Sequence, residues 1–173
     1  MKCKKGFYRL IIVWLANLSL VVNAQKSTVD LKDNWQFRQE GTAKWNTAKV
    51  PGEVHTDLLN NKMIPDPFYR DNEKKLTWIE KKNWEYKTSF SATATMLKLK
   101  HIELVFDGLD TYAKVYLNDK LVLKADNMFR QWRVDVRQHL KVGKNELRVV
   151  FKSAQNIIDS LAQKDLPFVI PDN

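Results

Sequence analysis

Alternation of apolar and polar residues recurs along much of the chain and predicts a series of short β-strands. Within 84–90, every second residue is aromatic or threonine, while Glu85, Lys87 and Ser89 lie between them. This alternation is typical of a strand with one buried face and one wet face. The same period marks the segments 35–38, 97–106, 112–117, 132–136 and 147–151.

Turn-forming residues separate these segments. Asn118-Asp119 lies between the strand 112–117 and the apolar run 121–123, and it suits a two-residue hairpin loop because both residue types tolerate a positive φ. Pro51-Gly52 ends a short extended piece. Many short strands with turns between them indicate an all-β fold, an antiparallel jelly-roll β-sandwich.

Two segments have helical spacing instead. In 53–63, Val54 and Leu58 fall on one face, and Thr56 suits the position of the amino-terminal cap. The segment 153–164 is amphipathic, with Ser153 as its cap. We therefore expect one or two short helices at the periphery of the sandwich.

The segment 64–73 follows the first expected helix and is irregular. Pro65 and Pro67 favour extended or turn geometry and exclude a helix around them. The pair Phe68-Tyr69 favours an ordered loop that packs on the body of the domain. Residues 76–79 are expected to be extended again.

The first 24 residues have the features of a secretory signal peptide. Four basic residues precede an apolar run from Leu10 to Val22, and Val22-Asn23-Ala24 is an acceptable cleavage signal. An uncleaved membrane anchor is the alternative, although the run is short and interrupted for a spanning helix. We expect a secreted or periplasmic protein with no membrane contact once residues 1–24 are removed.

The remaining residues divide into one domain and a short extension. Residues 25–153 contain all the expected strands, so they form the sandwich. Residues 154–173 read as the start of a linker or following region that is truncated. About 149 residues are enough to bury a hydrophobic core.

Composition excludes several classes of function. The net charge is +9, but the signal peptide carries four basic residues and no acidic ones, which leaves +5 on the rest of the chain. Those charges are scattered, whereas nucleic-acid binding needs a clustered basic surface. The only cysteine, Cys3, lies in the signal, and the three histidines are far apart in sequence, so we expect no disulfide and no metal site. Five scattered glycines form no phosphate-binding loop, and no cofactor is expected.

Candidate catalytic residues are few. The chain has no Gly-x-Ser-x-Gly nucleophile elbow. Asn72-Glu73 is the best candidate for half of a glycosidase carboxylate pair, but Lys74 and Lys75 follow it, and a solvated, ionised Glu73 is unsuited to act as an acid.

The other polar and aromatic candidates have structural interpretations. Asp107, Asp110 and the pair Asp126-Asn127 are interpreted as turn-forming residues, and Arg130 as part of a stack or ion pair. Trp84 and Trp132 are expected in the core, whereas Trp78, at the end of the irregular segment, could stack on a sugar.

Several longer motifs occur in one order along the chain. They are VPGEVHTDLL from Val50, IPDPFYRDNE from Ile64, WIE from Trp78, WEY from Trp84, GLDTYA from Gly108 and DNMFR from Asp126. Together they resemble the amino-terminal domain of β-mannosidases of glycoside hydrolase family 2, over residues 31–153. The resemblance implies a galactose-binding-like jelly roll that packs on an immunoglobulin-like sandwich and a catalytic (β/α)₈ barrel.

The resemblance also limits what this chain does by itself. Both catalytic glutamates of the family lie on the barrel, and Asn72-Glu73 matches a loop of the first domain, so no catalytic residue carries over. The family's first domain reaches a loop toward the rim of the sugar pocket, and the matching residues here are Arg70, Asn72, Glu73 and Trp78.

Three hypotheses follow from the sequence. The first is a non-catalytic scaffold and pocket-rim domain of a β-mannosidase that acts on β-mannoside glycans in the context of the full enzyme. The second is a free-standing carbohydrate-binding module. The third is an unstable product of a truncated gene.

Overall fold

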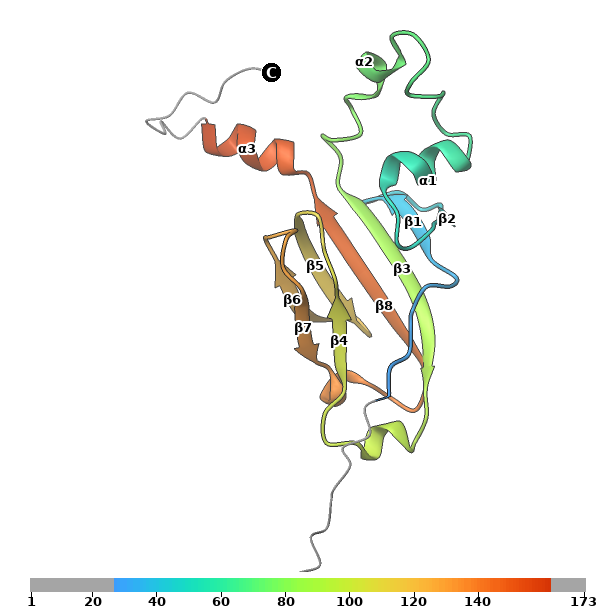
Figure 1. The fold of residues 1–173 in the computed structure, drawn as a ribbon, viewed down its shortest axis with the longest axis vertical. Coiled ribbons are helices and arrows are strands. Elements are labelled where there is room, and N and C mark those ends of the chain that lie inside the picture. Colours follow the sequence, from blue (N-terminus) through green and yellow to red (C-terminus); the bar gives the residue numbers. More distant parts are fainter. Residues whose placement is uncertain (1–26, 163–173) are drawn as a thin grey trace, which may run out of the picture.

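Antiparallel strands dominate residues 27–162, the part of the chain that the computed structural model describes. Six of them form one sheet in the order β2-β1-β3-β8-β5-β6, and β4 pairs with β7 in a second, two-stranded sheet (Figure 1). The strands are β1 Gln36–Gln39, β2 Asn46–Thr47, β3 Trp84–Ala92, β4 Glu103–Phe106, β5 Tyr112–Leu117, β6 Lys120–Ala125, β7 Trp132–Asp135 and β8 Gly143–Lys152. The expected all-β antiparallel sandwich is confirmed.

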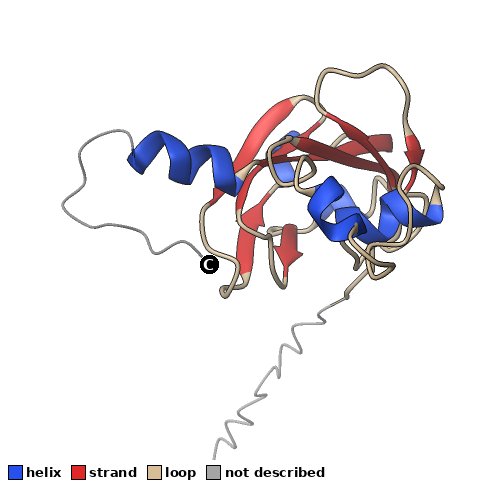
Figure 2. Cartoon of the chain, turned by 90° about the horizontal axis from the view of Figure 1, so that it is seen from above, coloured by secondary structure: helices blue, strands red, loops and turns tan. Residues whose placement is uncertain are grey.

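The described part of the chain also contains three α-helices. They are α1 Val54–Asn60, α2 Asn72–Leu76 and α3 Ala154–Ala162, and two short 3₁₀ turns cover Met96–Lys98 and Arg137–His139. Figure 2 shows the α-helices on opposite sides of the strands. The sequence predicted two of them and missed α2. The expected extended piece over 76–79 is wrong, because Leu76 ends α2.

Both expected helices are present, but only one has the expected cap. Ser153 caps α3, since its Oγ accepts the backbone N–H of Asn156 at 3.0 Å. The cap prediction for α1 is wrong: the helix begins after Glu53, and the Thr56 hydroxyl donates to the Glu53 carboxylate at 3.0 Å. The expected end of the last helix at Lys164, like the signal peptide, lies outside the described residues.

The strand pattern is correct apart from one early and one late start: the strand expected over 147–151 begins at Gly143. Asn118 and Asp119 have φ angles of 49° and 63° and close the β5–β6 hairpin, as predicted. The strand expected over 97–106 begins only at Glu103, because a 3₁₀ turn occupies Met96–Lys98. The Thr93 hydroxyl accepts the backbone N–H of Met96 at 3.1 Å, which stabilises that turn.

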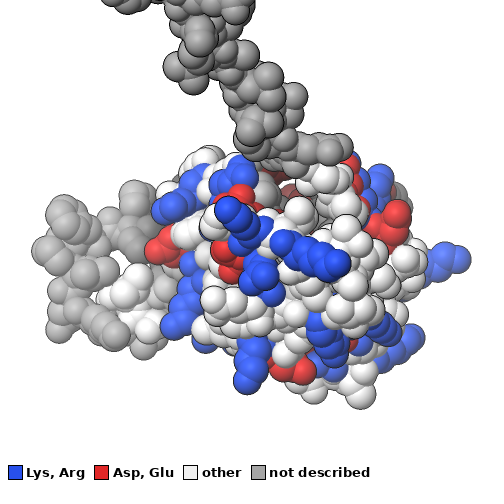
Figure 3. All heavy atoms as spheres, turned by 90° about the horizontal axis from the view of Figure 1, so that it is seen from below, with Lys and Arg blue, Asp and Glu red and all other residues white. Residues whose placement is uncertain are grey.

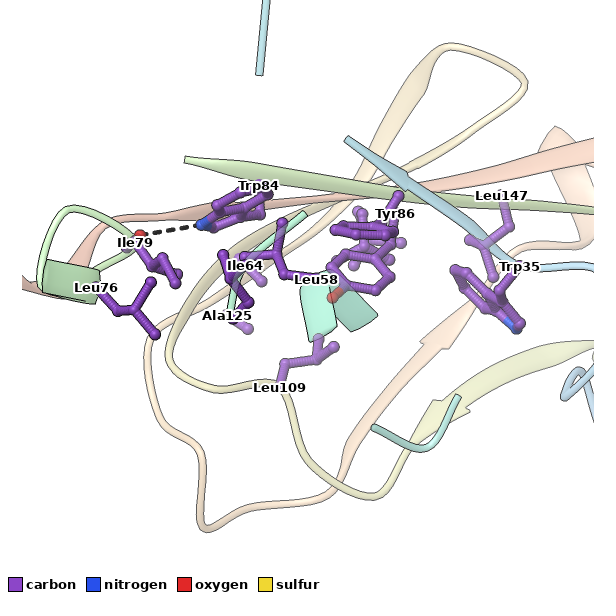
Figure 4. Packing of buried hydrophobic residues seen from close by; sticks show 14 residues of the cluster. Trp35, Leu58, Ile64, Leu76, Ile79, Trp84, Tyr86, Leu109, Ala125 and Leu147 are labelled. Carbon is purple, nitrogen blue, oxygen red and sulfur yellow. Dashed lines mark hydrogen bonds between the residues drawn. The ribbon is translucent and has the colours of Figure 1, made fainter. Parts of the chain in front are cut away.

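An aromatic cluster forms the centre of the core (Figure 4). The Phe37 ring lies 6.0 Å from the Trp84 ring and 5.7 Å from the Tyr86 ring, which joins β1 to β3. Leu58 of α1 and three residues of the segment between α1 and β3, Ile64, Leu76 and Ile79, pack against this cluster. The segment between α1 and β3 is therefore attached to the core at both of its ends.

Glu85 lies on the outer face of the large sheet, where the sequence predicted solvent exposure, but its side chain is buried. Glu85 is 5% exposed. Its carboxylate accepts hydrogen bonds from Arg38 Nε at 2.5 Å and Arg148 Nη1 at 3.2 Å. These arginines lie on the two neighbouring strands and also stack on aromatic rings, Arg38 on Trp45 and Arg148 on Tyr116. The long side chains from both strands cover the carboxylate.

A second buried carboxylate lies below α1. Asp57 is 2% exposed, and its two oxygens accept the Lys49 backbone N–H at 2.9 Å and the Tyr86 hydroxyl at 3.0 Å. These bonds tie α1 to the chain after β2 and to β3. Burial raises the pKa of Asp57, and the two hydrogen bonds only partly offset that effect.

Replacing Glu85 with alanine should destabilise the domain. The change leaves Arg38 without its anion and Arg148 with only the exposed Asp119, at 3.7 Å, and we expect a loss of about 2–3 kcal/mol in the free energy of unfolding. Urea unfolding followed by tryptophan fluorescence measures it. Glu103→Ala is the matched control, because it breaks the exposed Arg133–Glu103 pair and should cost less than about 1 kcal/mol. Equal losses in the two variants would contradict this role for Glu85.

The ionisation of Asp57 should make stability fall as the pH rises. Its pKa is higher in the folded than in the unfolded chain, so its stabilising contribution is complete below the unfolded value of about 4. That contribution decreases as the pH rises through the folded value. The substitution Asp57→Asn removes this ionisation, so the stability of wild type relative to the variant should be greatest at acidic pH and decline toward neutrality. Urea unfolding of both proteins between about pH 3.5 and 7 tests this, and a difference that grows with pH would refute it.

Candidate functional site

The strand register brings several loops to one end of the sandwich. Trp84, at the start of β3, pairs with Phe151 near the end of β8, and Tyr112, at the start of β5, pairs with Lys152. Ala125, at the end of β6, lies beside Ala113. The segments that adjoin these strand ends therefore share one end of the molecule, the upper end in Figure 1. We call the segments 61–83, 107–111 and 126–131 the loop end.

All four residues that the resemblance singled out lie in the loop end. Arg70 is exposed, has a φ of 54°, and its guanidinium lies 5.2 Å from the Tyr69 ring. Asn72 begins α2, and its Nδ2 donates to the Asp66 carbonyl at 2.8 Å. Glu73 is exposed. Trp78 is 37% exposed, with its ring 6.2 Å from that of Trp84.

The four residues do not meet in one pocket. A hollow of about 180 Å³ lies between α1 and α2, and Glu73 is the only one of the four among its lining residues, which are His55, Pro67, Glu73, Leu76, Thr77 and Glu80. The amide of Asn72 is already used inside its own loop. The structure therefore brings the candidates to one end of the fold without building a closed site from them.

The turn interpretation is confirmed for Asn127, whose Oδ1 accepts the backbone N–H of Phe129 at 2.8 Å, whereas Asp107 and Asp110 bond other side chains and not their own backbone. Asp107 accepts a hydrogen bond from Gln131 Nε2 at 2.8 Å, and Asp110 accepts one from the Thr111 hydroxyl. The Arg130 guanidinium lies 4.1 Å from the Trp132 ring, which confirms the predicted stack. Trp84 is buried and Trp132 packs against the core at partial exposure.

The expected packing of Phe68-Tyr69 on the body of the domain is wrong. Phe68 is 96% exposed, and Tyr69 is also exposed. The segment between α1 and β3 is ordered, but Ile64, Leu76 and Ile79 attach it to the core. Phe129, which sequence reasoning passed over, is 88% exposed in the other long loop of the loop end. The shared spacing in Asp66-Pro67-Phe68 and Asn127-Met128-Phe129 was the available signal.

The rest of the described surface has fewer features of a binding site than the loop end. A second hollow, of about 410 Å³, has a largely polar lining from β1, β3 and β8 that includes Gln36, Lys87, Ser89 and Glu146. At the end opposite the loop end, basic and acidic side chains are interspersed with uncharged ones (Figure 3). Within residues 27–162, no three His, Cys, Asp or Glu side chains cluster as metal ligands would, and no helix combines the length and apolarity needed to cross a membrane.

Proteins of known family match most of this chain. Among curated proteins, the chain is 38% identical over 134 residues to β-mannosidase B of Thermothelomyces thermophilus, a match that covers 76% of the chain and 16% of that protein. It is 33% identical over 146 residues to the β-mannosidase of Capra hircus, with 84% and 16% covered. The chain thus spans about one sixth of the length of these relatives.

Solved structures match in fold as well as in sequence. The β-D-mannosidase from Dictyoglomus thermophilum is 40% identical with a TM-score of 0.77, over 81% of this chain and 17% of that one. An exo-chitosanase from Amycolatopsis orientalis has a TM-score of 0.61 at 18% identity, over 68% and 16%, and this likeness shows the fold alone. The family described as glycosyl hydrolase 2 galactose-binding domain-like matches residues 35–172, and this chain belongs to it.

Proposed function

We propose that this chain is the amino-terminal, non-catalytic domain of a β-mannosidase-type glycoside hydrolase, with a jelly-roll sandwich that supports the catalytic barrel. The observation that carries the proposal is the 40% identity and TM-score of 0.77 to a β-D-mannosidase of which the chain covers only 17%. The activity on terminal β-mannosides then belongs to the longer protein.

We further propose that the segment around α2 contributes to the rim of the sugar pocket in that enzyme. Arg70, Asn72, Glu73 and Trp78 all lie in one end of the fold, and Asn72 holds its loop while Arg70, Glu73 and Trp78 keep exposed surface. An exposed indole offers a face on which a sugar ring can stack, and a carboxylate accepts hydrogen bonds from sugar hydroxyls. These contacts orient the substrate, and the residues are not acids or nucleophiles in the reaction.

The chain alone should neither bind mannose nor hydrolyse mannosides. We expect no heat of binding with mannose or mannobiose in calorimetric titration, and no release of nitrophenol from an aryl β-mannoside.

A fusion in which this chain replaces the matching segment of the Dictyoglomus thermophilum β-D-mannosidase should support turnover. There, Trp78→Ala should raise KM by about 3-fold or more, with a smaller effect on kcat, as for a residue that binds ground and transition states alike.

Lys120→Ala, at the start of β6 and far from the loop end, is the control and should leave KM unchanged. Binding of mannobiose by the isolated chain would favour the carbohydrate-binding module instead. Turnover by the isolated chain that is lost in Glu73→Gln would overturn the assignment as non-catalytic.

We also propose that the protein is secreted or periplasmic. The support is the basic segment followed by the apolar run from Leu10 to Val22. Expressed with this leader, the exported chain should begin at Gln25, as measured by mass spectrometry of the intact protein. Recovery of the uncleaved chain in the membrane fraction would support the alternative of an anchor.

A further inference from the structure

The larger hollow, of about 410 Å³, lies on the outer face of the large sheet. It spans β1, β3 and β8, which are neighbours in that sheet (Figure 1). Phe37, Tyr86 and Leu147 of these strands belong to the core, so the residues next to them point outward, because successive side chains of a strand alternate between faces. The outward-pointing residues of the lining are Gln36, Lys87, Ser89, Lys144 and Glu146.

The strand register gives the order of the charged groups in this hollow. Ser89 of β3 lies opposite Glu146 of β8, and Ser91 lies opposite Lys144. Lys87 precedes the Ser89–Glu146 pair along β3, and Lys144 lies on the other side of that pair. The hollow therefore has an ammonium group toward each end and a hydroxyl and a carboxylate between them.

Hydrogen bonds fix one wall of the hollow. The Thr88 hydroxyl donates to the Asp33 carbonyl at 2.9 Å, and the Trp35 indole N–H donates to the Leu31 carbonyl at 2.8 Å. Asn34, between these two bonds, has a φ of 58°, a left-handed conformation that asparagine tolerates. The chain before β1 is thus held at the rim of the hollow by contacts that need no ligand.

The polar side chains of the lining are not used by the fold. Within residues 27–162, the side chains of Gln36, Thr47, Ser89 and Glu146 make no hydrogen bond to the protein, and Lys87 forms no ion pair. The Lys87 ammonium instead lies 4.2 Å from the centre of the Trp45 ring. In the neighbouring row of the same face, by contrast, the Glu85 carboxylate is fully compensated by arginines. These groups therefore remain available to a ligand.

The surrounding face of the sheet carries an excess of cations. Lys114 and Lys124 lie directly opposite each other on β5 and β6, an arrangement of like charges that destabilises a sheet. Such an excess raises the local concentration of anions. The cations of this face are Arg38, Lys87, Lys114, Lys124, Lys144, Arg148 and Lys152, against the carboxylates of Glu40, Glu85, Asp119 and Glu146.

The mixture of groups in the hollow selects the chemistry of the ligand. Two ammonium groups favour an anion, whereas the Glu146 carboxylate needs a hydrogen-bond donor. A sulfate or a simple carboxylate offers no donor, and a neutral sugar offers no anion. A uronic acid unit supplies a carboxylate and several hydroxyls together. The volume of about 410 Å³ lies in the range of small-molecule sites.

We propose that this hollow binds an acidic saccharide, a short chain of uronate units. Lys87 and Lys144 bind carboxylates of successive units, and Glu146 accepts a hydrogen bond from a sugar hydroxyl between them. Ser89 and Gln36 donate to ring or hydroxyl oxygens. The proposal goes beyond the proposed β-mannosidase role and does not depend on it. The expectation that the chain does not bind mannose or mannobiose is unchanged, because neither sugar carries an anion.

Calorimetric titration of the chain with trigalacturonate tests the site. Saturable binding is expected at low ionic strength, and it should weaken as salt is raised from about 0.05 to 0.5 M, because salt screens the ammonium groups. The trimethyl ester has the same sugar rings without the charges, and it should bind about 10-fold more weakly or not at all. Citrate, an anion without sugar rings, should likewise bind at least about 10-fold more weakly.

Lys87→Gln and Lys144→Gln should each weaken binding of trigalacturonate by about 5-fold or more. Glu146→Gln should weaken it while leaving the salt dependence in place, since the lost contact is to a hydroxyl. Lys74→Gln is the matched control, because Lys74 is exposed on α2 in the loop end and its loss removes the same charge. All four variants should unfold in urea like the wild type, since none of these side chains belongs to the core.

Nuclear magnetic resonance of the ¹⁵N-labelled chain locates the ligand. The amide shifts caused by trigalacturonate should concentrate at residues 34–36, 87–89 and 144–146. Absence of binding at millimolar trigalacturonate would overturn the proposal, as would equal affinity for the ester or for citrate. Equal losses in Lys74→Gln and Lys87→Gln, or shifts confined to the loop end, would overturn it too. None of these results bears on the β-mannosidase assignment, which the fusion tests separately.

Discussion

The pairing of β3 with β8 is the constraint on which the rest of the structure depends. Their ladder runs from Trp84 opposite Phe151 to Ala92 opposite Gly143, the longest register in the described chain. Antiparallel pairing over this length fixes which strand ends lie together. The same ladder supplies Trp84 and Tyr86 to the core cluster and Glu85 to the outer face. One register therefore determines the core, the covered ion network and the position of the loop end.

Two buried carboxylates show how the sheet connects to the elements around it. Glu85 is compensated by cations from both neighbouring strands, so its burial reinforces the β1-β3-β8 order. Asp57 has no cation among its bonded partners and relies on a backbone N–H and a tyrosine hydroxyl. Burial raises the pKa of Asp57, and its two neutral donors offset that effect only in part. Asp57 thus fixes the position of α1 through its hydrogen bonds, in a buried environment that disfavours its charged form.

The sequence predicted the features that depend on near neighbours. The alternation in 84–90, the Asn118-Asp119 hairpin and the Ser153 cap are local, and all three are present. Glu85 was assigned to a wet face because its partners lie 47 and 63 residues away, and no local pattern reveals them. Helix α2 is only five residues long, too short to show a period, and Leu76 at its end is fixed by the core. The four rim candidates came from the resemblance alone, and the structure adds that the Asn72 amide already donates a hydrogen bond within its own loop.

Two separate sets of interactions hold the loop end in a defined conformation. Ile64, Leu76, Ile79 and Leu109 are buried in the core and set where each loop lies relative to the sheet. The direction of Phe68 and Phe129 is instead set by hydrogen bonds inside each loop, from the side chain and the carbonyl of Asp66 and Asn127. Because these bonds close over a few residues, they do not require the exposed rings to be covered in order to form. The domain can therefore hold apolar rings in water at fixed positions while its stability comes from the sheet.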